Sequence, residues 1–232
     1  MLQALIFDFD GLVIDTEETE FRAWREIYQR YDVELPLEMY LLCVGRGATS
    51  QVFRPYDYLV GQVGHELERE AILAECRQRN RALIDTQPIL PGVRELILEA
   101  KQRGLGLAVA SSSPQSWVEG HLIRLGLRDY FDALACGDEV ERTKPYPDPY
   151  LKALEKLAVS AKQAVAFEDS LNGMLAARAA GLFCIVVPGQ LTQYLTFGEV
   201  DLRVASLAEV SLDRLLRRFA SNGAQAGEGK SA

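Results

Sequence analysis

The chain has 232 residues, of which 48% are hydrophobic and 25% charged, as is typical of a soluble globular protein with one domain or one domain carrying an insert. Its formal net charge of −8 at pH 7 disfavours nucleic acid and anionic membrane surfaces as partners. An anionic substrate would therefore need a local cation.

The four cysteines are far apart and form no CxxC pair, which argues against a zinc site or a disulfide scaffold. Free thiols are typical of a reducing compartment, so we expect a cytoplasmic protein. The opening stretch MLQALIFDFD lacks a basic segment and a cleavage-site pattern, so we expect no secretory signal. No apolar run approaches the ~18 residues of a membrane span. Nothing in the sequence requires a partner subunit, so the expected state is a monomer.

The first predicted element is a short buried strand over residues 4–9, which carries Asp8 and is followed at once by Asp10. Residues 15–87 show no strand pattern. Their aromatic and aliphatic residues recur at helical spacing, which predicts a helical insert. An insert that follows the tip of the first strand would cover the carboxyl edge of the sheet, where ligands bind in open α/β folds. We therefore expect residues 15–87 to form a cap.

From residue 88 onward, short apolar strands alternate with amphipathic helices. This alternation predicts a doubly wound α/β core with a parallel sheet, made of residues 1–14 and 88–220. Ser113 and Ser170 are expected to cap the amino ends of two of the helices. The small polar residues 221–232 predict a disordered tail. The strands are expected at 105–111, 132–136, 164–169 and 183–188, and the helices at 91–104, 113–126 and 170–181.

Polar side chains gather where the predicted strands end. Because the carboxyl ends of parallel strands meet at one edge of a sheet, we expect these side chains to lie together. Clustered carboxylates need a compensating cation, and a few hard oxygen ligands with room for water and phosphate suit Mg²⁺. Mg²⁺ and Lys144 would also attract an anionic substrate. The polar residues are Asp8, Asp10, Ser111, Lys144, Glu168 and Asp169.

Four stretches, DFDGLVIDTE, VASSS, KPYPDPY and FEDSLNG, resemble the four motifs of the haloacid dehalogenase superfamily, in the expected order. The resemblance extends over about residues 4–190. The helical insert with DTE at its entrance is similar to that of the β-phosphoglucomutase-like subgroup. The resemblance implies a Rossmann-like α/β core with a cap and a Mg²⁺-dependent phosphatase that works through an aspartyl phosphate.

The resemblance also implies a role for each motif residue. Asp8 would be the nucleophile that attacks phosphorus. Asp10 would protonate the leaving oxygen and then deprotonate the attacking water. Ser111 and Lys144 would bind the phosphoryl oxygens, and Ser112 is a further candidate for substrate contact.

The metal and the hinge follow from the same resemblance. Mg²⁺ would be bound by the Asp8 carboxylate, the backbone carbonyl of Asp10 and Asp169, with Glu168 close by or acting through water. Thr16, at the hinge, would help to hold Asp10 as the cap closes.

Two members of the superfamily fit the sequence poorly. A haloalkanoate dehalogenase needs no Mg²⁺ and lacks an acid at the position of Asp10. A phosphonatase needs a lysine from its cap, but the first lysine of this chain is Lys101. A non-catalytic binding protein of this fold would be expected to lose the acids that are present here.

A sugar phosphomutase of the β-phosphoglucomutase type is the alternative that stays open. In the mutase a histidine precedes the FRAW stretch, whereas this chain has Glu20 there. The mutase cap also offers a lysine, and this cap offers only arginines, of which Arg46 and Arg54 are candidates for gripping the substrate. Hydrolysis of a small, sugar-phosphate-like metabolite is therefore the expected reaction.

Overall fold

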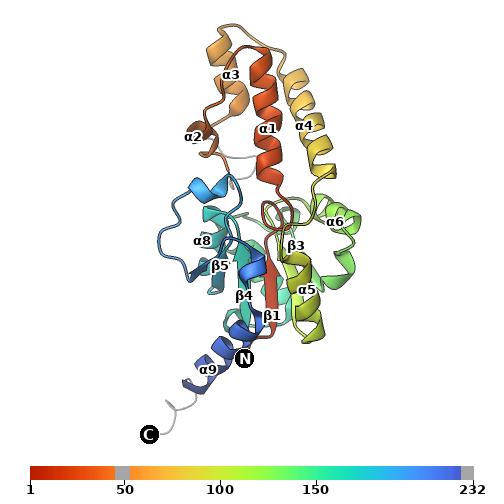
Figure 1. Ribbon diagram of the computed structural model, residues 1–232, viewed down its shortest axis with the longest axis vertical. Helices are drawn as coiled ribbons and strands as arrows, with labels where there is room; N and C mark the ends of the chain where they lie inside the picture. The colour runs from red at the N-terminus through yellow and green to blue at the C-terminus, as the bar shows by residue number, and fades with distance from the viewer. Residues whose placement is uncertain (45–52, 226–232) are drawn as a thin grey trace.

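The computed structural model describes residues 1–44 and 53–225, with side chains up to residue 221. A lower part contains the sheet with its covering helices, and an upper part consists of helices alone (Figure 1). None of the described helices is long and apolar enough to cross a membrane.

The sheet is parallel throughout and has the strand order β3-β2-β1-β4-β5-β6. The doubly wound α/β core predicted from the sequence is therefore confirmed. The last strand was not predicted, because it has only two residues and both are exposed. The strands are β1 (Ala4–Phe7), β2 (Gly106–Ala110), β3 (Ala133–Ala135), β4 (Ala164–Glu168), β5 (Phe183–Val186) and β6 (Leu202–Arg203).

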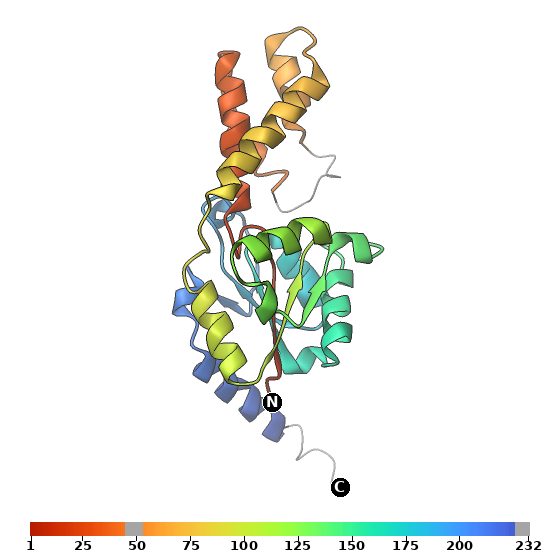
Figure 2. The ribbon, with the colours of Figure 1, turned by 90° about the vertical axis from the view of Figure 1, so that its right-hand side faces the viewer.

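The two faces of the sheet carry side chains of different size, because successive strand residues point to opposite faces. One face presents large residues such as Phe7 and Phe167 to α5 (Val93–Gln102), α6 (Gln115–Arg124) and α9 (Leu212–Gln225). The other face is rich in alanine and packs against α7 (Asp148–Leu157) and α8 (Leu171–Ala179). Figure 2 shows helices on both sides of the sheet. Short 3₁₀ helices lie at Arg128–Tyr130, Gly137–Glu139, Ala161–Gln163, Thr192–Tyr194 and Leu207–Glu209.

The helices between β1 and α5 form a unit with its own apolar core. Aromatic and aliphatic side chains share this core, and Leu191 from the loop after β5 packs into it. Two ion pairs, Arg30–Glu75 and Arg79–Glu26, join its long first and last helices at the surface. The helices are α1 (Thr16–Arg30), α2 (Leu37–Tyr40), α3 (Pro55–Val63) and α4 (Arg69–Asp85).

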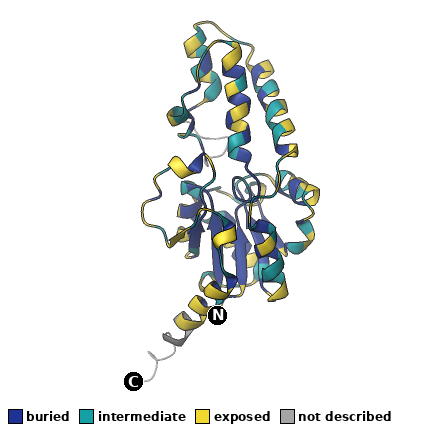
Figure 3. Cartoon of the chain, in the orientation of Figure 1, coloured by how far each residue is buried: buried dark blue, intermediate teal, exposed yellow. Residues whose placement is uncertain are grey.

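The topology brings the strand ends to the edge below this helical unit. β1 lies in the middle of the sheet, and Phe7 is in register with Val109 of β2 and Phe167 of β4. The chain leaves β1 for one side of the sheet and later crosses to the other, so β1 and β4 flank the switch point at which ligands bind in such folds. Figure 3 shows the strands buried below the more exposed helical unit.

Two local expectations were wrong. Helix α6 has Pro114 as its N-cap, with no side-chain capping bond, because the Ser113 hydroxyl instead donates to the Asp10 carboxylate. Helix α9 continues to Gln225, so residues 221–225 of the expected disordered tail are helical. Residues 226–232 lie outside the described part of the chain. Ser170 caps α8 as expected, since its hydroxyl accepts from the Gly173 backbone N–H.

Two helical glycines provide a matched test of the packing around the strand ends. A Cβ added at Gly173 would lie 1.9 Å from the carboxylate of Glu168, whereas one added at Gly120 of α6 would meet nothing within 4 Å. Gly173→Ala should therefore lower the free energy of unfolding by about 1–3 kcal/mol, as overpacking of a core does. Gly120→Ala should raise it by up to about 1 kcal/mol, through helix propensity alone. Urea denaturation measures both, and a stabilising Gly173→Ala would contradict the packing described here.

Candidate active site

A buried lysine joins two carboxylates at the carboxyl edge of the sheet. Lys144, in the loop before α7, places its Nζ 2.6 Å from Asp8 Oδ1 and 2.6 Å from Glu168 Oε1. Tyr150 and Ser170 donate further hydrogen bonds to the Glu168 carboxylate. The side chains of Lys144, Asp8 and Glu168 are 4%, 8% and 0% exposed, so water screens their charges little.

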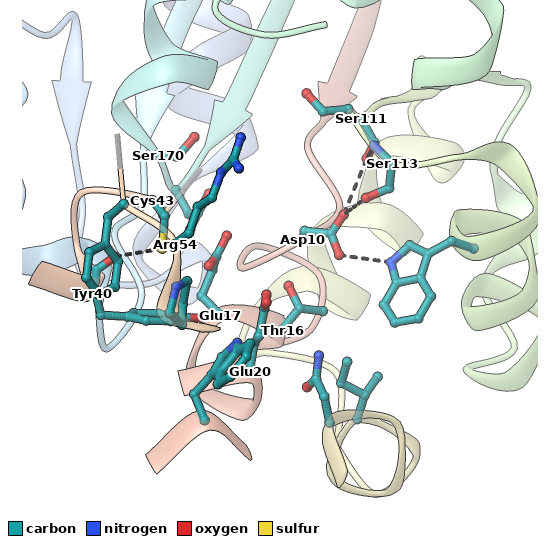
Figure 4. A pocket seen from close by; sticks show the side chains of 18 of the residues that line it. Asp10, Thr16, Glu17, Glu20, Tyr40, Cys43, Arg54, Ser111, Ser113 and Ser170 are labelled. Atoms are coloured by element: carbon teal, nitrogen blue, oxygen red, sulfur yellow. Dashed lines mark hydrogen bonds between the residues drawn. The ribbon is translucent and has the colours of Figure 1, made fainter. Parts of the chain in front are cut away.

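Asp10 lies two residues beyond Asp8 but makes a separate set of contacts. Its Oδ2 accepts from Ser113 Oγ at 2.6 Å and from Ser111 Oγ at 3.4 Å. Its Oδ1 accepts from the indole Nε1 of Trp117 at 3.0 Å. Figure 4 shows the Asp10 carboxylate directed toward Ser111 and Ser113 on one side of the cavity.

The acids outnumber the lysine, and their pKa values reflect this. Burial, together with the charge of Glu168, raises the pKa of Asp8 to about 8 even though Lys144 lowers it. Burial and the charges of Asp8 and Glu168 raise the pKa of Asp169 well above its usual range. Burial opposes the charge of Lys144, but the two carboxylates that it contacts raise its pKa above its ordinary value. The cluster therefore has room for a second positive charge.

The donor set fits a hard divalent cation. Asp8, Glu168 and Asp169 each offer a carboxylate oxygen, and the three oxygens lie within 4.8 Å of one another. Oxygen-only ligands in this number suit Mg²⁺. Glu168 is already bound by Lys144, Tyr150 and Ser170, so Asp8 and Asp169 are the more available ligands.

The turn after β1 has no room for a side chain beside these acids. Gly11 has a φ of +79°, which favours glycine, and a Cβ there would lie 2.2 Å from Asp169 Oδ2. The Thr192 hydroxyl lies 3.4 Å from the same oxygen. The Asp169 carboxylate therefore lies close to the Gly11 backbone and accepts a hydrogen bond from Thr192.

A cavity of about 730 Å³ opens between this cluster and the helices α1–α4. Its size suits a small metabolite. Figure 4 shows Glu17, Glu20, Tyr40 and Arg54 around the same space as Asp10. The residues that line it include Asp8, Asp10, Ser111, Ser112, Ser113, Trp117, Lys144, Asp169 and Ser170 of the core, and Thr16, Glu17, Glu20, Trp24, Tyr40, Arg54, Arg69, Leu73, Asn80 and Ile84 of the α1–α4 unit.

Most residues singled out in the sequence lie in this one place. Ser112 accepts a hydrogen bond from the backbone N–H of Lys144 at 3.3 Å, and Thr16 begins α1 at the cavity wall. Glu20 lines the cavity and has an exposed side chain. Partial removal from water by the surrounding side chains, together with the charge of Asp10, raises its pKa. Arg54 lines the cavity with its guanidinium 3.8 Å from Asp57. Arg46 lies outside the described residues.

Sequence reasoning missed three residues that contact the acids. Ser113 was interpreted as a helix cap, and Trp117 and Tyr150 received no role. Trp117 and Tyr150 each lie near the start of a helix at the carboxyl edge of the sheet, where a polar aromatic group can reach a strand end. This position in the sequence could have identified Trp117 and Tyr150 as candidate contacts of the acids.

Helix α6 also contacts the chain where it returns from α4. The guanidinium of Arg124 donates to the backbone carbonyls of Ile84, Asp85 and Gln87, at 3.1–3.4 Å. The same helix supplies Trp117 to Asp10. Helix α6 therefore contacts both Asp10 and the chain at the end of α4.

Comparison with known proteins agrees with this geometry. The sequence profile of haloacid dehalogenase-like hydrolases matches residues 5–187. The Bacillus subtilis protein YhcW, which carries a provisional phosphatase name, is 41% identical over 93% of this chain and 97% of its own length. Hexitol phosphatase B of Escherichia coli is 36% identical over 92% of this chain and 96% of its own. The crystal structure of a CbbY variant from Rhodobacter sphaeroides in complex with xylulose-(1,5)bisphosphate has a TM-score of 0.70 at 34% identity, covering 91% and 97% of the two chains.

The match over most of the chain defines a hydrolase with a Rossmann-like core. The protein belongs to the haloacid dehalogenase-like hydrolase family, and within it to the phosphatases. Solved structures that share its fold include a β-phosphoglucomutase-like member, as the position of the helical insert predicted.

The raised pKa of Asp8 leads to a prediction about metal binding. At pH 7 a carboxyl with a pKa of about 8 carries a proton, and a cation that needs the carboxylate has to displace it. Binding of Mg²⁺ should therefore release protons, and its affinity should rise between pH 6 and pH 8 by up to about tenfold per unit. Titration calorimetry in two buffers of different ionisation enthalpy measures the release. Equal heats in both buffers, with an affinity independent of pH, would contradict the placement of the metal at Asp8.

Proposed function

We propose that this protein is a Mg²⁺-dependent phosphatase that hydrolyses a small sugar or polyol phosphate through an aspartyl phosphate on Asp8. The observation that carries the proposal is the contact of Lys144 with Asp8 at the floor of a cavity that Asp10 also lines. A hexitol phosphatase and a protein crystallised with a sugar bisphosphate are among the relatives that support this substrate class.

Asp8 is the nucleophile in this proposal. Its carboxylate attacks phosphorus, a bond forms between the carboxylate oxygen and phosphorus, and the bond from phosphorus to the substrate alcohol breaks. Lys144, held against Asp8, offsets charge on the transferring group, and Ser111 supplies a hydroxyl at the same edge. Water then attacks the phosphorus of the intermediate and regenerates the carboxylate.

Asp10 moves the protons. It gives one to the departing alcohol oxygen and takes one from the attacking water. Hydrogen bonds from Ser113 and Trp117 fix the orientation of the carboxylate for these proton transfers.

Asp8 and Asp169 would hold the cation, with Glu168 beside them. When bound there, Mg²⁺ supplies a Lewis acid that polarises a phosphoryl oxygen. Tyr150 and Ser170 keep Glu168 oriented toward Lys144, so the lysine stays at the nucleophile.

Hydrolysis is favoured over phosphoryl transfer to a sugar. Glu20, at the sequence position where the mutase has a histidine, lines the cavity, and partial removal from water together with the charge of Asp10 raises its pKa. Two like charges cannot form the hydrogen-bonded link that a histidine could make with Asp10. Binding of a sugar is then less able to control the position of Asp10, and water can attack the aspartyl phosphate.

The test is the fate of β-glucose 1-phosphate and a panel of hexitol and pentose phosphates in the presence of Mg²⁺. We expect free phosphate, without accumulation of glucose 6-phosphate, and loss of at least about 10³-fold in kcat for Asp8→Asn, as for removal of a nucleophile. Circular dichroism should show that this variant is folded. Glucose 6-phosphate without free phosphate would instead establish the mutase, and full activity of Asp8→Asn would exclude Asp8 as the nucleophile.

The acid role of Asp10 predicts a dependence on the leaving group. Asp10→Asn should reduce kcat about 10²–10⁴-fold on a sugar phosphate, whose alkoxide needs a proton to leave. The loss should be smaller on p-nitrophenyl phosphate, whose phenolate leaves without one. Stopped-flow measurement of phosphoryl transfer separates this step from hydrolysis of the intermediate. Equal losses of the transfer rate on both substrates would show that Asp10 is not the acid.

A further inference from the structure

One polar side chain interrupts an apolar face of α4. This face is formed by residues at helical spacing, which are Leu73, Cys76, Asn80 and Ile84. Cys76 packs into the apolar core of the α1–α4 unit. Leu73, Asn80 and Ile84 line the cavity above the acids. An amide at this position is not needed for the packing of α4 against α1, since its neighbours along the face are apolar.

The amide oxygen of Asn80 has no hydrogen-bond partner within the part of the chain that the structure describes. Among the buried side-chain oxygen and nitrogen atoms of the described residues, Asn80 Oδ1 alone is unsatisfied. Leaving such an atom unpaired has a cost in stability, because its hydrogen bonds to water are lost on burial and are not replaced. The cost is removed when a ligand in the cavity supplies the partner.

The chemistry of the surroundings selects the kind of ligand group. An amide oxygen needs a hydrogen-bond donor. A hydroxyl group can hydrogen-bond an amide in either orientation of the amide, because a hydroxyl both donates and accepts. A phosphate dianion offers no donor. It would also meet the negative charges of Glu17 and Glu20, which line the same cavity. A neutral hydroxyl therefore fits Asn80, and a second phosphate does not.

We propose that Asn80 is a substrate-binding residue that hydrogen-bonds a hydroxyl group of the alcohol part of the phosphate ester. It makes the enzyme select polyhydroxylated monophosphates over esters that lack a hydroxyl at this position. The inference rests on the proposed function, because the phosphoryl group is taken to be bound at Asp8 and Lys144.

The test compares two substrates and two substitutions. D-glucitol 6-phosphate carries the hydroxyls, and p-nitrophenyl phosphate carries none. Asn80→Leu should lower kcat/KM on glucitol 6-phosphate at least about tenfold more than on p-nitrophenyl phosphate, the effect of a lost hydrogen bond with an unsatisfied partner. Gln78→Leu is the matched control, because it also replaces a side-chain amide by leucine but at an exposed position of α4. It should leave kcat/KM unchanged on both substrates.

Thermal unfolding of the ligand-free protein gives a second readout. Asn80→Leu removes an unpaired buried amide, so its Tm should equal or exceed that of the wild type. A Tm several degrees lower, or equal losses on the two substrates, would show that the amide supports the fold rather than the substrate. A wild type that does not prefer glucitol 6-phosphate would also overturn the proposal.

Binding separates this proposal from the proposed function. If the wild type hydrolyses neither substrate with Mg²⁺, the proposed function fails for these two esters, while the contact of Asn80 can still be judged by the rise in Tm that glucitol 6-phosphate causes. That rise should be smaller in Asn80→Leu than in Gln78→Leu. An equal rise in both variants would exclude a contact between Asn80 and the ligand.

Discussion

The site depends on one buried cation held between two carboxylates. Lys144 comes from a loop far along the chain, yet its Nζ contacts both Asp8 and Glu168 at the ends of neighbouring strands. A buried ion pair is strongly destabilised when one partner is lost, because the other charge is then left unpaired. Tyr150, Ser170 and the close approach of Gly173 fix Glu168, and Glu168 in turn fixes the lysine. Asp8, the proposed nucleophile, is thus positioned by a hydrogen-bonded network that includes Lys144 and Glu168.

The architecture assigns different tasks to different elements. The parallel sheet brings its carboxyl ends to one edge, and the alanine-rich face lets α7 and α8 pack closely beside Lys144 and Glu168. Helix α6 supplies Trp117 to Asp10 and binds the return from α4 through Arg124. The α1–α4 unit has its own core, so its cavity-lining residues can differ without disturbing the sheet. In the proposed function, the core therefore carries the chemistry and the α1–α4 unit contributes to substrate selection.

The sequence was sufficient for the fold and for the acids, but not for their local partners. The sheet edge was identified from the short apolar strands and from the DxD, Lys and Glu-Asp motifs. Strand ends and charged residues can both be recognised from the sequence alone. The orientation of Asp10 was not visible, since it depends on Ser113 and Trp117, whose hydroxyl and indole could equally have served a helix cap and a hydrophobic core. The exposed strand β6 was missed because two exposed residues give no hydrophobic signal. Asn80 was missed because an unpaired amide is recognised only when its surroundings are known.

The central claim is that phosphorus is transferred to Asp8 itself. The most direct measurement is rapid acid quenching of the enzyme during turnover of ³²P-labelled substrate with Mg²⁺, followed by peptide mapping. The account predicts an acid-stable, hydroxylamine-sensitive label on the peptide that contains Asp8, formed and consumed at rates that match turnover. Turnover without any labelled enzyme, or a label on another residue, would contradict it.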